Sequence, residues 1–188
     1  ISKGLLQKAL SEVVRNSFNM ISVDRDTSTN DTALLLANGA AGNKEICEGT
    51  PEYDSFVKAL KHVAVTLARM MASDGEGATK LLEVTVVNAA DEDDARVLAK
   101  SVITSNLVKT AVYGSDANWG RIMCALGYSG KEFNPDIVDI SINSVSGSLQ
   151  LVENGMAADY SEVQYPRRPR VLRQPQPDCA RLRARHLR

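Results

Sequence analysis

The chain has 188 residues, of which 44% are hydrophobic, and a formal net charge of −1 at pH 7. This length suits one domain with its own core, and no apolar run approaches the roughly 18–20 residues of a membrane span. The three cysteines lie far apart without C-x-x-C spacing, which argues against a disulfide framework or a zinc site and favours reduced thiols in a cytosolic protein.

The N-terminal region predicts two helices, a strand and a polar turn. Residues 5–16 are amphipathic and predict a helix, and residues 18–23 predict a short strand. The polar turn at residues 24–31 offers good N-cap side chains to a helix predicted at residues 32–37. The chain starts at Ile1 without an initiator methionine or a signal-peptide region, and we therefore expect it to be cut from a longer polypeptide.

The polar turn has one feature of a calcium site. Carboxylate, hydroxyl and amide side chains alternate from Asp24 to Asn30, as at the start of an EF-hand loop. Thr29 stands where that loop needs glycine, and Leu35 stands where it needs a bidentate glutamate. Turn formation and helix capping therefore explain the segment better than a metal does.

A long helix is predicted from Pro51 to about Ala72. Its expected buried stripe contains Val57, Leu60, Ala64, Leu67 and Met71. The opposite face carries Lys58, His62 and Arg69, so His62, the only histidine of residues 1–160, is expected to be solvated. The chain therefore offers no convincing base for a Ser-His-Asp or Cys-His hydrolase mechanism.

The loop at residues 73–80 has the pattern of a pocket for a small charged molecule. Gly75 and Gly77 bracket Glu76 and can adopt positive φ, while Lys80 supplies the opposite charge for a ligand such as an amino acid. A Walker phosphate loop would run from a strand into a helix, whereas here a helical pattern precedes and a β-rich run follows. On this segment alone, a helix C-cap turn with incidental charges is the simpler explanation.

The remaining pattern predicts an α/β (α+β) fold. Four acidic residues at 91–94 lie at the positive dipole end of a predicted helix, which needs no ligand. Adjacent terminal strands with polar alternation favour a layered sandwich over a purely parallel sheet. The predicted elements are strands at residues 82–87, 107–113, 137–142 and 148–152, and helices at residues 91–104 and around 118–122.

The last part of the chain differs in composition from the body. Residues 161–188 contain eight arginines, two acidic residues and four of the six prolines. We find no apolar periodicity in them, and they therefore predict a disordered tail, separate from a body at residues 1–160. Nucleic-acid binding is not favoured, because Tyr165 is the only aromatic residue of the tail.

Several segments in order closely resemble ornithine acetyltransferase of arginine biosynthesis, the bifunctional glutamate N-acetyltransferase family. The resemblance covers residues 1 to about 160. It implies a layered α/β/β/α sandwich of the self-cleaving N-terminal-nucleophile kind. The segments that carry it are residues 18–24 with 26–32, then 74–80, 107–111 and 116–122.

The resemblance implies a precursor that cleaves itself at an Ala-Thr bond. The freed threonine, expected just upstream of Ile1, attacks N-acetylornithine and passes the acetyl group to glutamate, with its own α-amine as base. This chain would be the β chain, without a catalytic residue of its own. An α chain of the same precursor would supply oxyanion donors and a substrate-binding lysine in a cytoplasmic α2β2 assembly. No cofactor, metal, nucleic acid or membrane is implied, and the use of acetyl-CoA stays open.

The resemblance assigns substrate binding to Glu76, through its carboxylate to a substrate ammonium. Gly77 and Lys80 are expected to shape the loop, and Lys80 could equally be a structural ion-pair partner. Four other residues look like core architecture near the site rather than chemistry: Asp26, Asp31, Trp119 and Arg121.

Two departures leave alternatives open. Arg25 stands where the family generally has glycine, and the tail does not resemble the family's C-terminus, which carries substrate-binding asparagine and threonine or serine. A catalytically silent fragment or binding subunit and a related self-cleaving aminopeptidase-like hydrolase therefore remain alternatives to an active acetyltransferase.

Overall fold

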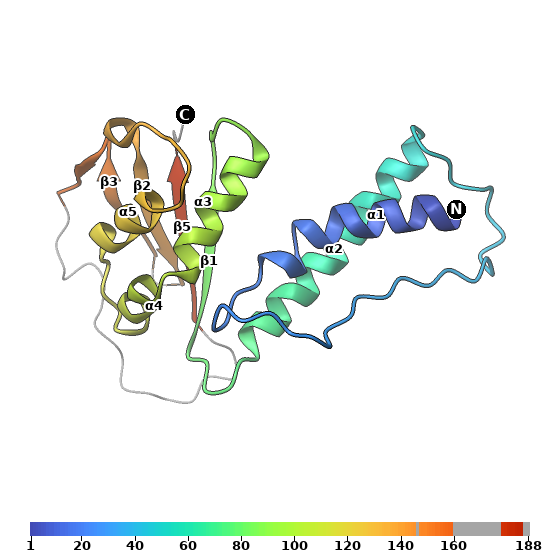
Figure 1. Ribbon diagram of the computed structural model, residues 1–188, viewed down its shortest axis with the longest axis horizontal. Coiled ribbons are helices and arrows are strands. Elements are labelled where there is room, and N and C mark those ends of the chain that lie inside the picture. The colour runs from blue at the N-terminus through green and yellow to red at the C-terminus, as the bar shows by residue number, and fades with distance from the viewer. Residues whose placement is uncertain (146, 160–177, 186–188) are drawn as a thin grey trace. The chain divides into compact units, whose positions relative to one another are not determined.

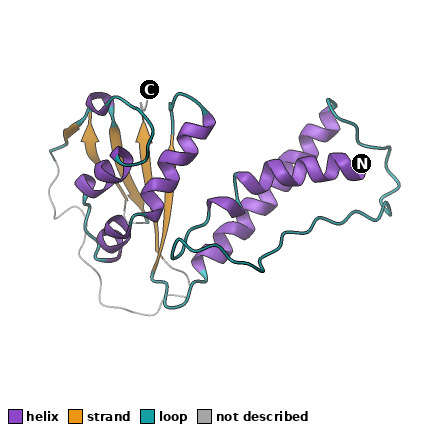
Figure 2. Ribbon diagram, viewed as in Figure 1, coloured by secondary structure: helices purple, strands orange, loops and turns teal. Residues whose placement is uncertain are grey.

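A computed structural model describes residues 1–145, 147–159 and 178–185 of the chain (Figure 1). The chain divides into two compact units, Ile1–Asp74 and Gly75–Arg188. Figure 2 shows that the first unit contains helices and loops, whereas the second contains helices and the strands of a sheet. None of the described helices is long and apolar enough to cross a membrane.

The first unit is built on two helices that begin at well-formed caps. Helix α1 (Lys3–Arg15) starts after Ser2, whose hydroxyl accepts a hydrogen bond from the Leu5 amide. Helix α2 (Pro51–Ser73) starts after Thr50, which accepts from the Tyr53 amide. The two helices pack side by side (Figure 1), and both predicted helices are confirmed. Their buried residues are Ala9, Val13, Tyr53, Ala64 and Ala68.

The segment between these helices corrects two predictions. Residues 18–23 were expected to form a strand, but the structure has a 3-10 helix, η1 (Phe18–Met20), followed by irregular backbone. Residues 32–37 were expected to form a helix and have neither helix nor strand. Six residues are too few for a stable helix without tertiary packing, and a strand requires a partner strand for its backbone groups.

The predicted buried stripe of α2 is only partly correct. Ala64 is buried, and Val57 and Leu60 are half-buried, but Leu67 and Met71 are exposed. His62 is exposed, as its place on the polar face predicted.

The second unit contains a mixed sheet with strand order β1-β5-β2-β3-β4. β1 and β5 are parallel, and every other neighbouring pair is antiparallel. The predictions of strands near residues 82–87, 137–142 and 148–152 are confirmed, and so is the α/β class. The strands are β1 (Lys80–Val86), β2 (Asp139–Ser144), β3 (Gly147–Glu153), β4 (Met156–Ala157) and β5 (Asp178–Arg185).

Three helices lie against one face of this sheet (Figure 1). They are α3 (Glu92–Thr104), α4 (Asn106–Tyr113) and α5 (Trp119–Gly127), and a short 3-10 helix, η2 (Pro135–Ile137), precedes β2. Apolar side chains of the helices and strands form one core between the two layers. Its largest fully buried members include Leu98 and Val102 of α3, Leu126 of α5, Ile140 of β2 and Leu151 of β3.

Residues 107–113 form helix α4, so the strand predicted there is wrong. The Ser105 hydroxyl accepts a hydrogen bond from the Val108 amide and caps the helix. Val108 and Ala111 are buried and Val112 is half-buried. Their spacing of three and four residues fits one helix face better than the alternation of a strand.

The predicted disorder of residues 161–188 is wrong for Asp178–Arg185, which form β5. Alanine and leucine at positions 180, 182 and 184 alternate with arginine at 181, 183 and 185, a period of two that is typical of a strand. β5 pairs with β1 and with β2. The rest of the predicted tail lies outside the described residues.

Candidate functional site

Glu76 is presented on a tight turn directly before β1. The Ala78 amide donates a hydrogen bond of 2.9 Å to the Gly75 carbonyl, which closes a four-residue turn with Glu76 and Gly77 at its centre. Gly77 has φ 66°, and a positive φ at the third residue is the requirement of a type II turn. Glu76 is exposed at the second position. The turn therefore fixes the backbone on both sides of an accessible carboxylate.

Lys80, the first residue of β1, connects this turn to the C-terminal end of α4. Its Nζ donates to the Val112 carbonyl at 2.6 Å and to the Ser115 hydroxyl at 2.5 Å. A cation at the end of a helix is stabilised by the last carbonyl groups and by the helix dipole. These contacts give the half-buried Lys80 a structural role, and a direct contact of Lys80 with substrate stays a prediction.

We expect replacement of Lys80 with methionine to lower the melting temperature by about 4–8 °C. The variant keeps most of the apolar stem but leaves two acceptors without their charged donor, and hydrogen bonds to charged groups contribute about 1.5–3 kcal/mol. Thermal unfolding followed by circular dichroism measures the effect.

Lys131→Met is the matched control, because the Lys131 ammonium pairs with the Asp94 carboxylate and not with the end of a helix. A loss for Lys80→Met no larger than for Lys131→Met would contradict the structural role of Lys80.

The segment at residues 116–122 joins α4 to α5. Asn118 caps α5, because its Oδ1 accepts from the Arg121 amide at 3.2 Å, and its Nδ2 donates to Asp116 Oδ2 at 2.9 Å. Arg121 Nη1 donates to the Leu107 carbonyl at 3.0 Å and to Thr110 Oγ1 at 3.2 Å. Trp119 packs against the hydrophobic core. The architectural role expected of Trp119 and Arg121 agrees with these contacts.

Two of the motif regions are thus brought together in the second unit. Lys80 links the Glu76 turn to residues 112 and 115, which lie between the motif segments 107–111 and 116–122. Sequence reasoning missed Ser115, whose φ of 57° marks a tight turn. No local pattern pointed to it, because its partner Lys80 lies 35 residues away.

The motif at residues 18–32 belongs to the first unit, where its polar side chains form local turns. The Asp26 amide donates to Asp24 Oδ1 at 2.8 Å, and the Ser28 hydroxyl accepts from the amides of Asn30 and Asp31 at 3.1 Å. Asp26 and Asp31 are exposed. The prediction that these two residues belong to the core is therefore wrong. Among the residues that the structure describes, no group of three or more His, Cys, Asp or Glu is placed to hold a metal ion.

Arg25 has φ 84°. The sequence suggested a positive φ here, because Arg25 stands where the family generally has glycine.

We expect Arg25→Gly to raise the free energy of unfolding by about 0.5–1 kcal/mol. The left-handed region costs a residue with a side chain about 1–2 kcal/mol, and the added freedom of glycine in the unfolded chain offsets part of that gain. Chemical denaturation of both proteins measures the difference. Arg25→Ala retains the Cβ and should show no gain, so equal stability of the two variants would contradict the strain.

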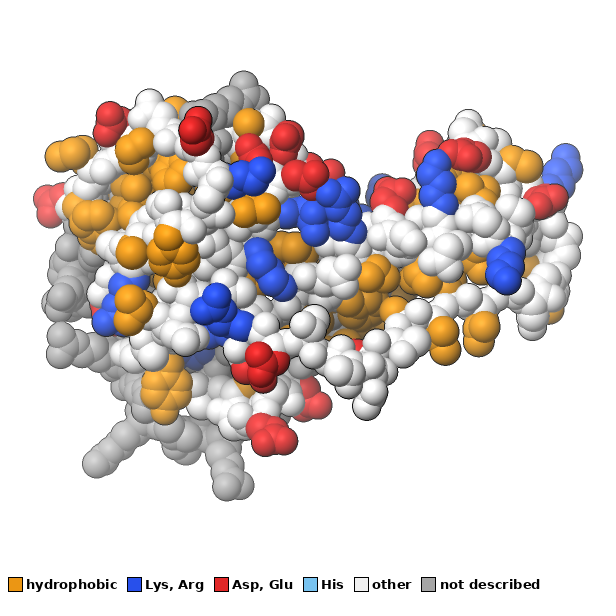
Figure 3. Space-filling view, in the orientation of Figure 1, with side chains coloured by type: hydrophobic (Ala, Val, Ile, Leu, Met, Phe, Trp, Pro, Cys, Tyr) orange, Lys and Arg blue, Asp and Glu red, His pale blue; other side chains and the backbone are white. Residues whose placement is uncertain are grey.

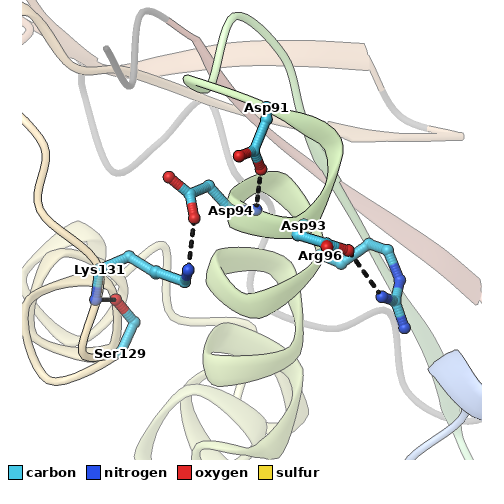
Figure 4. Close-up of polar contacts among 6 residues, drawn as sticks. All are labelled: Asp91, Asp93, Asp94, Arg96, Ser129 and Lys131. Carbon is cyan, nitrogen blue, oxygen red and sulfur yellow. Dashed lines mark hydrogen bonds and ion pairs between the residues drawn. The ribbon is translucent and has the colours of Figure 1, made fainter.

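The acidic start of α3 is engaged in capping and ion pairs (Figure 4). Asp91 Oδ1 accepts from the Asp94 amide at 2.8 Å, and Asp94 pairs with Lys131 at 2.5 Å. The hydrogen bond and charge of Asp94 raise the pKa of Lys131. Asp93 pairs with Arg96 at 3.2 Å. The prediction that these acids need no ligand agrees with the contacts.

Lys100, farther along α3, lies in surroundings that disfavour its positive charge. Burial lowers the pKa of the half-buried Lys100, and the charges of Arg96 and Lys109 lower it further. The charged form of Lys100 therefore costs the folded state free energy.

Comparison with known proteins decides the family. The model of the ArgJ family matches residues 1–175. The chain belongs to the ArgJ family. It is similar to the arginine biosynthesis bifunctional protein ArgJ of Caldanaerobacter subterraneus subsp. tengcongensis, with 56% identity over 86% of this chain and 40% of that protein. The corresponding ArgJ 1 of Clostridium acetobutylicum is 57% identical over the same shares.

The fold is also that of a solved ArgJ. The crystal structure of the arginine biosynthesis bifunctional protein ArgJ from Bacillus halodurans has a TM-score of 0.83 and 40% identity, and the match covers 97% of this chain and 83% of that chain. The present ArgJ-family chain spans about two fifths of the length of the curated relatives it matches.

Proposed function

We propose that this chain is the β-chain part of an acetyltransferase that moves the acetyl group of N-acetylornithine to glutamate in arginine biosynthesis. The observation that carries the proposal is the ArgJ-family match over residues 1–175. Relatives with 56% and 57% identity are named arginine biosynthesis bifunctional proteins. The Glu76 turn lies within the matched residues and offers an exposed carboxylate for a substrate ammonium.

The transfer would proceed in two balanced steps through a threonine outside this chain. The threonine hydroxyl attacks the acetyl carbonyl of N-acetylornithine, its proton passes by way of the threonine α-amine to the leaving nitrogen, and ornithine departs. The glutamate amine then attacks the acetyl ester, so that N-acetylglutamate forms and the threonine hydroxyl is restored. An α-amine base fits a chain in which His62 is exposed on the surface of α2.

Glu76 would bind and orient the substrate. An ionised carboxylate paired with an ammonium forms a charge-assisted hydrogen bond, which is stronger than a neutral one. Gly77 would set the turn by its positive φ, and Lys80 would hold the turn through Val112 and Ser115. Gly77 and Lys80 would thus shape the loop that presents Glu76 to the substrate.

The proposed partner is an α chain from the same precursor, in a cytoplasmic α2β2 enzyme. This chain covers 40% of the curated ArgJ of Caldanaerobacter but 83% of the chain in the Bacillus crystal structure. The chain in that crystal is therefore much shorter than a full-length curated relative, which fits a protein divided into two chains.

A catalytically silent fragment is the second candidate. Arg25 strains a turn within one motif, and residues 176–188 lie outside the match to the ArgJ family model. The chain would then keep the fold of an ArgJ protein without a complete substrate pocket.

The experiment is an assay of the complete gene product with N-acetylornithine and glutamate. The proposal predicts equal amounts of ornithine and N-acetylglutamate, with ornithine release dependent on glutamate. Cleavage of an added peptide substrate at its N-terminal residue, without acetyl transfer, would favour the aminopeptidase-like hydrolase. A folded, complete gene product with neither reaction would favour the silent fragment.

A further inference from the structure

The pair Asn-Gly occurs twice in the chain, at residues 38–39 and 154–155. Such a pair can be modified without an enzyme, because the backbone nitrogen of the glycine can attack the side-chain amide carbon of the asparagine. Glycine allows this attack most readily, since it has no Cβ and adopts conformations closed to other residues. Asn38 and Asn154 are both exposed. The two pairs differ in the hydrogen bonds around the attacking nitrogen.

The Gly39 amide is available for attack on Asn38. It donates no hydrogen bond among those of the described residues, and Gly39 is exposed. A Cβ added to Gly39 would meet no atom within 4 Å, so the space around this residue is open. Figure 3 shows the surface of the first unit, on which the loop between η1 and α2 runs along the path drawn in Figure 1. The nitrogen of Gly39 can therefore approach the Asn38 side chain without losing a hydrogen bond of its own.

The Asn38 side chain lies beside the Gly39 peptide. Asn38 Oδ1 accepts a hydrogen bond of 3.0 Å from the Ala40 amide, which forms the turn in which an asparagine bonds the backbone two residues further on. This bond keeps the amide carbon of Asn38 next to residue 39. The same donor faces the oxygen on which negative charge develops during the attack, and a donor in that place stabilises the charge. Local geometry therefore favours reaction at Asn38.

The same reaction is hindered at Asn154, although this side chain is exposed. The Gly155 amide donates a hydrogen bond of 2.9 Å to the Val138 carbonyl, and the Asn154 amide donates one of 2.9 Å to Asp139 Oδ1. Gly155 lies so close to η2 that an added Cβ would be 2.5 Å from the Pro135 carbonyl oxygen. The nitrogen of Gly155 can therefore attack only after the β3–β4 turn has opened.

We propose that Asn38 is a site of spontaneous deamidation, whereas the fold protects Asn154. The Gly39 nitrogen forms a bond to Asn38 Cγ, the bond from Cγ to Nδ2 breaks, and ammonia leaves with the proton from the Gly39 nitrogen. Water then opens the resulting succinimide at either carbonyl, which yields aspartate or isoaspartate. Water is the co-reactant, and no enzyme, oxidant or metal takes part.

Deamidation changes the charge and the backbone of the loop. Residues 32–43 contain no charged side chain, so the new carboxylate at position 38 is the only charge in this stretch. Isoaspartate also carries the main chain through the former side chain and lengthens it by a carbon atom. The inference concerns the chemical ageing of the chain and is independent of the proposed acetyl transfer.

The test follows both asparagines in the complete gene product during incubation at mildly alkaline pH, with a second sample unfolded in urea. Peptide mass spectrometry distinguishes asparagine from the heavier aspartate and isoaspartate. In the folded protein we expect Asn154 to convert at least about tenfold more slowly than Asn38, because its reaction requires local opening. In urea the two rates should lie within about threefold of each other, since unfolding removes this protection.

Gly39→Ala tests the attacking nitrogen directly. The variant should slow conversion of Asn38 at least about fivefold, because a Cβ hinders the attack and disfavours positive φ. Gly42→Ala is the matched control, since Gly42 belongs to the same loop, has a φ of 62° and would also meet no atom within 4 Å. It should leave the rate at Asn38 unchanged.

Three results would overturn the inference. The first is an Asn38 that stays intact in the folded protein and converts only in urea. The second is equal conversion of Asn38 and Asn154 in the folded protein. The third is a difference between them that persists undiminished in urea, because neighbouring side chains and not the fold would then set the rates.

Discussion

Replacing Glu76 with glutamine in the complete enzyme is expected to lower kcat/KM roughly tenfold to a few hundredfold. The substitution keeps the shape of the side chain and removes the charge that would face the substrate ammonium. A hydrogen bond to a charged group contributes about 1.5–3 kcal/mol, and each 1.4 kcal/mol corresponds to about tenfold. Self-cleavage should be unaffected, because it requires no bound amino acid. Acetyl-transfer kinetics alongside electrophoresis of the processed chains measure both quantities.

Glu132→Gln is the matched control for Glu76→Gln, because Glu132 is also exposed and belongs to no motif segment. It should change neither kinetics nor processing. A purely structural role of Glu76 would give a lower melting temperature and impaired processing, with little change in the kinetics of the mature enzyme. A fully processed Glu76→Gln enzyme with unchanged kcat/KM would remove Glu76 from the site.

Replacing Gly155 with alanine is expected to destabilise the chain by about 2–4 kcal/mol and to lower its melting temperature by about 5–15 °C. Asn154 and Gly155 form the turn between β3 and β4 with φ of 47° and 72°. A Cβ at Gly155 would lie 2.5 Å from the Pro135 carbonyl oxygen and 2.7 Å from Asp136 Cα. Neither backbone atom can move away without displacing η2. Calorimetry or circular dichroism measures the shift.

Gly130→Ala separates the steric clash from the backbone strain. Gly130 has a similar φ of 80°, but an added Cβ would meet no atom within 4 Å. This variant should cost only the conformational strain of about 1–2 kcal/mol. Equal losses for Gly130→Ala and Gly155→Ala would contradict the close packing of the β3–β4 turn on η2.

Helices with a strong local signal could be predicted from the sequence. Thr50 followed by Pro51 marks the start of α2, and Asp91 before three acidic residues marks the start of α3. In both cases the cap and the first turn are adjacent in sequence, so local chemistry determines where the helix begins.

Elements that depend on distant partners could not be placed in this way. Residues 107–113 contain two valines that favour a strand locally, but the cap at Ser105 and burial against the core produce α4. β5 exists as a strand because β1 and β2 lie on either side of it. Because residues 178–185 are rich in arginine, the alternation of alanine and leucine with arginine was not recognised as the pattern of a strand.

The candidate site likewise combines a local signal, which could be predicted, with a contact between distant residues, which could not. Glu76 was found because two nearby glycines marked a turn, and Gly77 does adopt positive φ. The anchoring of that turn depends on Lys80 reaching Val112 and Ser115, which lie 32 and 35 residues away. No local pattern carries such a contact, so the sequence left two roles open for Lys80.

Trapping the covalent intermediate would show whether the acetyl group passes through a threonine outside this chain. The complete gene product would be mixed with N-acetylornithine in the absence of glutamate, quenched and digested, and the acetyl group located by mass spectrometry. We expect acetylation of a threonine outside residues 1–188, and this acetyl group should be lost as N-acetylglutamate forms when glutamate is added. An acetyl group on a residue of 1–188, or transfer to glutamate without an acetylated threonine, would contradict transfer through the upstream threonine.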